Sequence, residues 1–112
     1  MHIRKILAVV LLGLSLSATA DFTTLTAAYE VPIRDLRMPR NEGGTLTFRR
    51  CPDCERETVR VNKRTRYMLN DRDLQLKEFR EELQRVRNKK MTGATVMHHL
   101  ASNTITSVKV SL

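Results

Sequence analysis

The chain has 112 residues, of which 41% are hydrophobic, and its 20 basic and 12 acidic side chains give a formal net charge of +8. This length allows one small domain with a limited hydrophobic core. The positive charge favours anionic partners such as lipid headgroups, cell-wall polymers or nucleic acid, or it serves solubility alone. The sequence contains no internal repeat and no low-complexity segment.

Residues 1–20 have the three parts of a secretory signal peptide. A basic start (Arg4-Lys5) precedes the apolar run 6–16, and Ala18-Thr19-Ala20 places small residues before a cut at Asp21. The apolar run is shorter than the roughly 20 residues that span a bilayer. We therefore expect the mature chain to work in the periplasm or as a secreted protein, without a membrane span. Export makes nucleic acid the least expected of the anionic partners.

Residues 21–43 are expected to form an N-terminal arm and a linker. The apolar side chains between residues 22 and 36 are spaced too irregularly for a long amphipathic helix. Alternation over residues 29–33 predicts a short strand, and Pro32 within it favours the edge of a sheet. The composition of residues 39–44 is typical of a turn.

Two alternating segments, residues 44–50 and 57–61, predict a β-hairpin around Cys51-Pro52-Asp53-Cys54. Pro52 holds its φ at about −65°, so we expect a type I turn with a neighbouring bulge, and a register shift of one residue is an alternative. The expected cross-strand pairs are Leu46–Val59, Thr47–Thr58, Arg50–Glu55 and Cys51–Cys54.

The remaining elements follow in order. Residues 65–69 predict a strand that stops in a turn over residues 70–73. An apolar stripe at helical spacing then predicts about three turns of amphipathic helix. Two closing strands, residues 94–100 and 104–112, flank a turn at Ser102-Asn103. The helical stripe consists of Leu76, Phe79, Leu83 and Val86.

From residue 44 the order is strand, strand, strand, helix, strand, strand, so we expect a mainly β fold with one helix (α+β). A small antiparallel barrel of OB or SH3-like type suits this order. The runs Gly44-Thr45-Leu46-Thr47, Val59-Arg60-Val61 and Thr65-Arg66-Tyr67, with the closing run 105–110, resemble exported bacterial OB-like small β-barrel domains of unknown function. The resemblance covers about residues 44–112 and implies a fold more than a function. The longer charged helix and the Cys-Pro-Asp-Cys turn depart from it.

Cys51 and Cys54 are compatible with three kinds of site. An exported protein favours a disulfide, and the ends of a four-residue turn are close enough to form one. A thiol–disulfide catalyst is the second possibility, because Arg49, Arg50 and Arg56 supply the positive charge that lowers a thiol pKa. A metal site needs further ligands, and adjacent strand residues such as His98 and His99 point to opposite faces. The balance favours a disulfide.

A basic segment around Tyr67 is the remaining candidate surface for an anionic ligand, with a simply solvated face as the alternative. It consists of Arg60, Lys63, Arg64 and Arg66. The sequence assigns no catalytic, cofactor-binding or metal-binding residue. We expect a small non-enzymatic binding or structural module of the cell envelope. The alternatives are a periplasmic thiol–disulfide redox protein that uses Cys51 and Cys54, and an accessory subunit whose arm docks on a larger protein.

Overall fold

The computed structural model describes residues 25–112, which form one mainly β domain with a single α-helix, as the sequence predicts. The expected signal segment, residues 1–20, lies outside the described residues. A short 3-10 turn, η2 (Ile33–Asp35), follows the first strand, and the helix α1 (Leu76–Arg85) lies between the fifth and sixth strands. The strands are β1 (Thr26–Pro32), β2 (Thr45–Arg49), β3 (Arg56–Arg60), β4 (Arg66–Leu69), β5 (Arg72–Leu74), β6 (Gly93–His99) and β7 (Thr104–Val110).

The strands form one mixed sheet, whereas the sequence favoured an antiparallel one. The hydrogen-bonded order is β1-β6-β7-β3-β2, and β4 pairs with both β7 and β5. β4 runs parallel to β7 over four residue pairs, and β3 meets β7 in parallel at Arg60 and Thr104. Parallel neighbours need a long crossover. Here the connection from β4 to β7 includes α1. The alternation of apolar and polar residues within one strand does not indicate which strand lies beside it or in which direction that strand runs.

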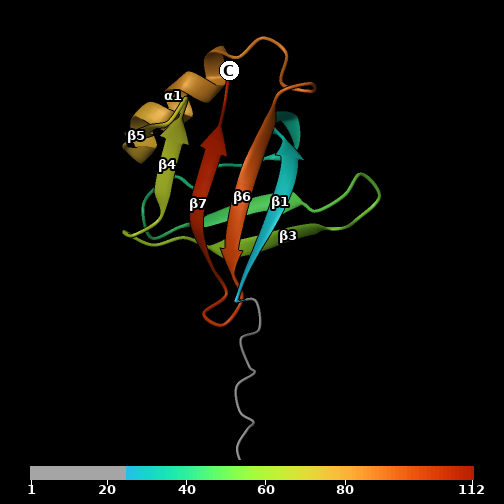
Figure 1. Cartoon of the computed structure of the whole chain (residues 1–112), viewed down its shortest axis with the longest axis vertical. Helices are drawn as coiled ribbons and strands as arrows, with labels where there is room; N and C mark the ends of the chain where they lie inside the picture. The colour runs from blue at the N-terminus through green and yellow to red at the C-terminus, as the bar shows by residue number, and fades with distance from the viewer. Residues whose placement is uncertain (1–24) are drawn as a thin grey trace, which may run out of the picture.

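The β2–β3 hairpin has the predicted register. Leu46 pairs with Val59, and Thr47 pairs with Thr58, whose hydroxyl oxygen lies 3.1 Å from that of Thr47. A shift of one residue would move Leu46 out of the core, where it is fully buried. In Figure 1 the hairpin runs across the direction of β1, β6 and β7. Side chains from both sets of strands contribute to one core.

The stretch expected to be an arm contributes a strand and core residues in its described part. β1 pairs with β6 over its whole length, and it is the edge strand that Pro32 predicts. Val31, Ile33 and Leu36 are buried in the core. Burial of these apolar side chains stabilises the domain.

The helix covers one end of the sheet with its predicted stripe. Leu76, Phe79 and Leu83 are buried, and Val86, the first residue beyond the helix, packs at the edge of the core. The ring centroid of Phe79 lies 5.5 Å from that of Tyr67 on β4. None of the described helices is long and apolar enough to cross a membrane.

A short strand, β5, precedes the helix where the sequence predicts only a turn. Asn70 and Asp71 both have positive φ values, 51° and 68°, which is the geometry of a two-residue type I′ turn. Because two residues complete the turn, Arg72–Leu74 are free to pair with β4. The predicted four-residue turn is therefore two residues too long.

Candidate functional site

The hairpin tip is closed by the expected disulfide between Cys51 and Cys54, whose Cα atoms lie 5.1 Å apart. The amide of Cys54 donates a hydrogen bond to the Cys51 carbonyl at 3.1 Å. No residue of the tip has a positive φ, which agrees with the constraint that Pro52 imposes. The disulfide ties a β-turn that extends beyond the last paired residues, Arg49 and Arg56.

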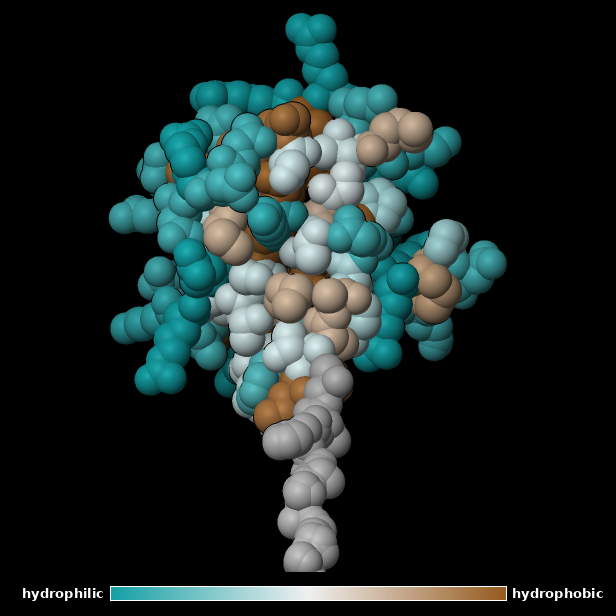
Figure 2. All heavy atoms as spheres, viewed as in Figure 1, coloured by the Kyte–Doolittle hydropathy of each residue, from teal (hydrophilic) through white to brown (hydrophobic). Residues whose placement is uncertain are grey.

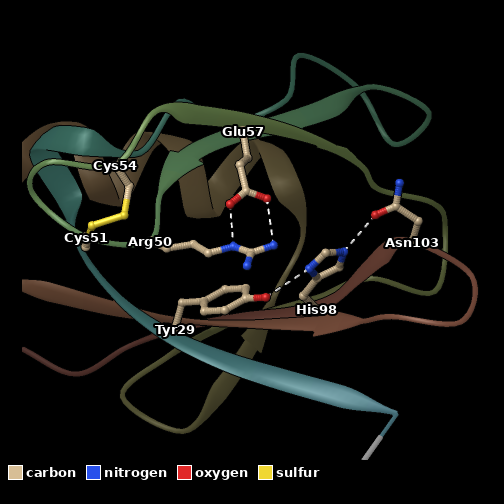
Figure 3. Close-up of polar contacts among 7 residues, drawn as sticks. All are labelled: Tyr29, Arg50, Cys51, Cys54, Glu57, His98 and Asn103. Carbon is tan, nitrogen blue, oxygen red and sulfur yellow. Dashed lines mark hydrogen bonds and ion pairs between the residues drawn. A yellow bond between two sulfur atoms is a disulfide. The ribbon is translucent and has the colours of Figure 1, made fainter.

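Arg50 folds back from the tip and forms an ion pair with Glu57 (Figure 3). Its Nη2 lies 2.9 Å from Glu57 Oε1, and its Nε contacts the other carboxylate oxygen. The hairpin register expected from the sequence placed Arg50 opposite Glu55. The ladder ends before that pair, and Glu57, which lies opposite Phe48, is the diagonal neighbour of Arg50 on the same face.

The Arg50 side chain also covers Tyr29 on β1, with its guanidinium carbon 4.9 Å from the ring centroid. The Tyr29 ring also stacks with Phe48, at a centroid distance of 5.6 Å and an interplanar angle of 28°. A cation above an aromatic ring is attracted by the electron density of the ring face. Arg50 therefore joins the hairpin tip to the edge strand β1, 21 residues earlier in the chain.

A hydrogen-bonded chain continues from Tyr29 into the sheet (Figure 3). The Tyr29 hydroxyl lies 3.3 Å from His98 Nδ1, and His98 Nε2 lies 2.8 Å from Asn103 Oδ1. With the amide oriented in this way, Nε2 donates to Asn103 and Nδ1 accepts from Tyr29. His98 is only 4% exposed, so these two bonds satisfy a buried imidazole.

This polar chain has the properties of a structural network. In the part of the chain that the structure describes, the hydrogen-bond partners of His98 are the Tyr29 phenol and the Asn103 amide, and no serine, threonine, cysteine or carboxylate is among them. Arg50 and Glu57 satisfy each other. These contacts attach the hairpin tip to β1, β6 and the β6–β7 turn.

The neighbouring histidine points to the other face and meets hydroxyl groups. His99 Nδ1 lies 2.7 Å from Ser102 Oγ, which lies 2.7 Å from Thr104 Oγ1. A serine hydroxyl and an imidazole are two of the three members of a Ser-His-Asp catalytic triad. No carboxylate among residues 25–112 accepts a hydrogen bond from His99, so the described residues do not supply the third member. The same residues contain no group of three or more His, Cys, Asp or Glu side chains that could hold a metal ion.

The four basic residues predicted to form an anionic-ligand surface are all exposed, but they differ in their partners. Arg66 donates from Nη2 to both carboxylate oxygens of Asp73, at 2.9 and 3.1 Å, and this ion pair raises the pKa of the guanidinium above its usual value. Arg60, Lys63 and Arg64 form no ion pair with any described residue. Three of the four predicted side chains are therefore available to an anion.

A hollow of about 430 Å³ lies beside Arg64, between the 62–65 turn and the β6–β7 turn. Two hydrogen bonds hold the 62–65 turn in place. The Thr65 hydroxyl donates to the Ile105 carbonyl at 2.6 Å, and the Arg64 amide donates to Asn62 Oδ1 at 2.8 Å. The hollow is lined by one cation, one imidazole, one amide, three hydroxyl groups and one aliphatic residue, and no acidic residue. The lining residues are Asn62, Arg64, His99, Ser102, Thr104, Ile105 and Thr106.

Sequence reasoning identified Arg64 but not the hydroxyl groups that face it. Ser102, Thr104 and Thr106 belong to a turn and strand about 40 residues later, and nothing in their local pattern distinguishes them from ordinary surface residues. Only the pairing of β3 and β4 with β7 brings them beside Arg64.

No family model, curated protein or solved structure matches this chain.

Proposed function

We propose that the protein is an exported, non-enzymatic binding module of the cell envelope, located in the periplasm or secreted. Its ligand is an anionic group of an envelope component, bound at the hollow beside Arg64. The observation that carries the proposal is the presence of three exposed cations, Arg60, Lys63 and Arg64, that form no ion pair within residues 25–112 and adjoin a hollow lined by hydroxyl groups. Phosphate and carboxylate oxygens accept hydrogen bonds from hydroxyl and guanidinium groups.

The surface around this hollow is mixed: Leu100 in the β6–β7 turn is 45% exposed, whereas segment 60–64 is cationic. Figure 2 shows a face over β1, β6 and β7 in which residues of intermediate hydropathy prevail, with hydrophilic residues along its flanks. Thr95, Met97 and Thr106 are partly or fully exposed on these strands. Positive charge near the hollow comes from the adjacent segment 60–64. An anionic polymer is therefore attracted to this flank of the domain.

An OB-type barrel accounts for the position of the hollow. The segment after β1 bridges to the free edge of β2: the Arg37 amide donates to the Thr47 carbonyl at 2.8 Å, and the Thr47 amide donates to the Arg37 carbonyl at 3.1 Å. This bridge supports closure of the strand order β1-β6-β7-β3-β2 through one continuous segment, residues 26–37. In OB barrels the loop between the last two strands takes part in ligand binding. Here that loop is the β6–β7 turn, which lines the hollow.

Binding of the purified protein to phosphatidylglycerol vesicles and to soluble polyphosphate, with phosphatidylcholine vesicles as the neutral control, tests the proposal. The double variant Arg60→Gln/Arg64→Gln is expected to bind either anionic probe about tenfold more weakly. The matched variant Arg72→Gln/Arg87→Gln removes the same charge from other exposed positions and is expected to bind within about twofold of the wild type. Equal losses in the two variants would show that net charge alone attracts the probes, and would refute a site.

Thiol–disulfide exchange is a second candidate function, favoured by the exposure of Cys51 at the hairpin tip. Arg49 and Arg56 lie on either side of the tip and would stabilise a thiolate. An insulin-reduction assay separates the two functions. Exchange activity that disappears in Cys51→Ser/Cys54→Ser, while anion binding stays unchanged, would favour the redox function. Absence of exchange activity in the wild type leaves the disulfide as a structural link.

A further inference from the structure

A second hollow, with a different character, lies between α1 and the segment that follows β1. It has a volume of about 360 Å³. Its apolar part comes from Ile33, Leu36 and Leu83, which also belong to the core, and from the partly buried Met38. Ile33, Leu36 and Leu83 are already buried to at least nine-tenths, so they form the floor of the hollow, and Met38 supplies most of the apolar surface that an alkyl chain placed there would cover.

The rim of this groove is cationic. Arg34, Arg80 and Lys89 line it, and none of its lining residues is acidic. Arg34 and Arg80 form no ion pair within residues 25–112, although Arg80 also borders a neighbouring hollow that contains Glu42. The two guanidinium groups are therefore free to pair with an acidic headgroup.

Lys89 has a separate task at the end of the helix. Its ammonium group donates to the carbonyl oxygens of Val86 and Gln84, at 2.7 and 3.1 Å. The carbonyl end of a helix repels anions, and a cation bound to it cancels that repulsion. Lys89 thus removes the electrostatic obstacle to an acidic group at this end of the groove.

Four backbone amides along the groove already have hydrogen-bond partners within the domain. The amides of Ile33 and Arg34 donate to Thr92 and Lys89, at 2.9 and 3.1 Å. The amides of Leu36 and Arg37 donate to Ile33 and Thr47, at 3.0 and 2.8 Å. Peptides that dock on a strand need free main-chain donors. Apart from the Gln84 amide, the side chains that line the groove offer a ligand apolar contact and positive charge.

We propose that this groove binds a single-chain anionic amphiphile of the fatty-acid type, with the alkyl chain against Met38 and the floor of the groove and the carboxylate between Arg34 and Arg80. This site goes beyond the proposed anion hollow. It uses other residues, it lies at the helix-covered end of the sheet and away from the β6–β7 turn (Figure 1), and it needs an alkyl chain.

Titration of the purified protein with dodecanoate below its micelle concentration, followed by calorimetry and by amide chemical shifts, tests the proposal. Dodecanoate is expected to bind and to shift the amides of residues 33–38 and of α1. Butyrate keeps the carboxylate without the long chain, and dodecyl maltoside keeps the chain without the charge. Both are expected to bind at least about tenfold more weakly.

Two double variants locate the headgroup. Arg34→Gln/Arg80→Gln is expected to weaken dodecanoate binding about fivefold to tenfold and to leave dodecyl maltoside binding unchanged. Arg72→Gln/Arg87→Gln, the matched control, is expected to bind dodecanoate like the wild type. Arg60→Gln/Arg64→Gln should also bind it normally, which separates this site from the anion hollow. Absence of dodecanoate binding, shifts confined to the β6–β7 turn, or equal affinity for dodecanoate and dodecyl maltoside would each overturn the proposal.

Discussion

The guanidinium of Arg50 lies over the ring of Tyr29, with its central carbon 4.9 Å from the ring centroid, while its nitrogens bind Glu57. The contact joins a disulfide-closed hairpin tip to the edge strand of the sheet. Tyr29 in turn reaches His98 on β6 through its hydroxyl. Arg50 therefore links β3 to β1 directly and to β6 through Tyr29. Its removal is expected to lower the stability of the domain.

Replacement of Arg50 by Gln is expected to lower the free energy of unfolding by about 1 kcal/mol, because it removes a cation–π contact and an exposed ion pair. In a Tyr29→Leu background the same change should cost about 0.5 kcal/mol less, because the ring is no longer present. Tyr29→Phe keeps the ring and should leave the cost of Arg50→Gln unchanged. Urea denaturation of the single and double variants provides the measurement. An equal cost in all three backgrounds would show that Arg50 and the ring do not interact.

Replacement of both cysteines, Cys51→Ser/Cys54→Ser, is expected to lower the free energy of unfolding by about 2 kcal/mol, because the unfolded chain loses a short closed loop. A reducing agent should destabilise the wild type by a similar amount and have no effect on the double variant. The measurement is denaturation of both proteins with and without reductant. A wild type that is insensitive to reductant would mean that the disulfide contributes nothing to stability.

The stability of the protein is expected to fall between about pH 10 and pH 12 because of Tyr67. Burial, with a smaller contribution from Glu42, raises the pKa of Tyr67 to about 12. Above the ordinary tyrosine pKa of about 10, the unfolded chain loses this proton while the folded chain retains it, so the unfolded state is favoured. The loss should reach roughly 2 kcal/mol at pH 12.

The matched variants for this pH effect are Tyr67→Phe and Tyr29→Phe. Tyr67→Phe should abolish the fall, whereas Tyr29→Phe, which keeps Tyr67, should retain it. At pH 7, Tyr67→Phe should be neutral or stabilising by up to about 1 kcal/mol, since the buried Tyr67 hydroxyl has no hydrogen-bond partner among the described residues. A pH profile of Tyr67→Phe that follows the wild type would rule out Tyr67 as the cause.

At the β4–β5 turn, Asp71→Gly is expected to be more stable than Asp71→Ala by about 1 kcal/mol, because the φ of 68° at this position is strained for a residue with a Cβ. Both variants lose the Asp71 ion pair with Lys109, so that loss cancels in the comparison. At Asp73, within β5, the order should be reversed, because Gly weakens a strand. Thermal denaturation of the four variants compares the two positions. An Ala variant as stable as the Gly variant at position 71 would contradict the turn geometry.

Local pattern was sufficient where the interacting residues lie close together in the chain. The alternation on either side of Pro52 predicted the pairs Leu46–Val59 and Thr47–Thr58, because a short turn leaves few registers and only one buries the apolar face. The helical stripe predicted the burial of Leu76, Phe79 and Leu83 in the same way. The sequence alone also identified the cations Arg60, Lys63 and Arg64 as a candidate surface. Export of the chain remains an expectation from the sequence, because the segment that predicts it lies outside the described residues.

Only the tertiary structure determined which strands became neighbours. Nothing in β1 specifies β6, and nothing in β4 specifies a parallel partner, because alternation indicates a buried face and not what covers it. The Tyr29–His98 contact spans 69 residues, and the hydroxyl groups beside Arg64 come from a strand about 40 residues away. The charge of this protein can therefore be obtained by reading its residues, whereas the hollows beside those charges form only when long-range pairing assembles the strands over the core.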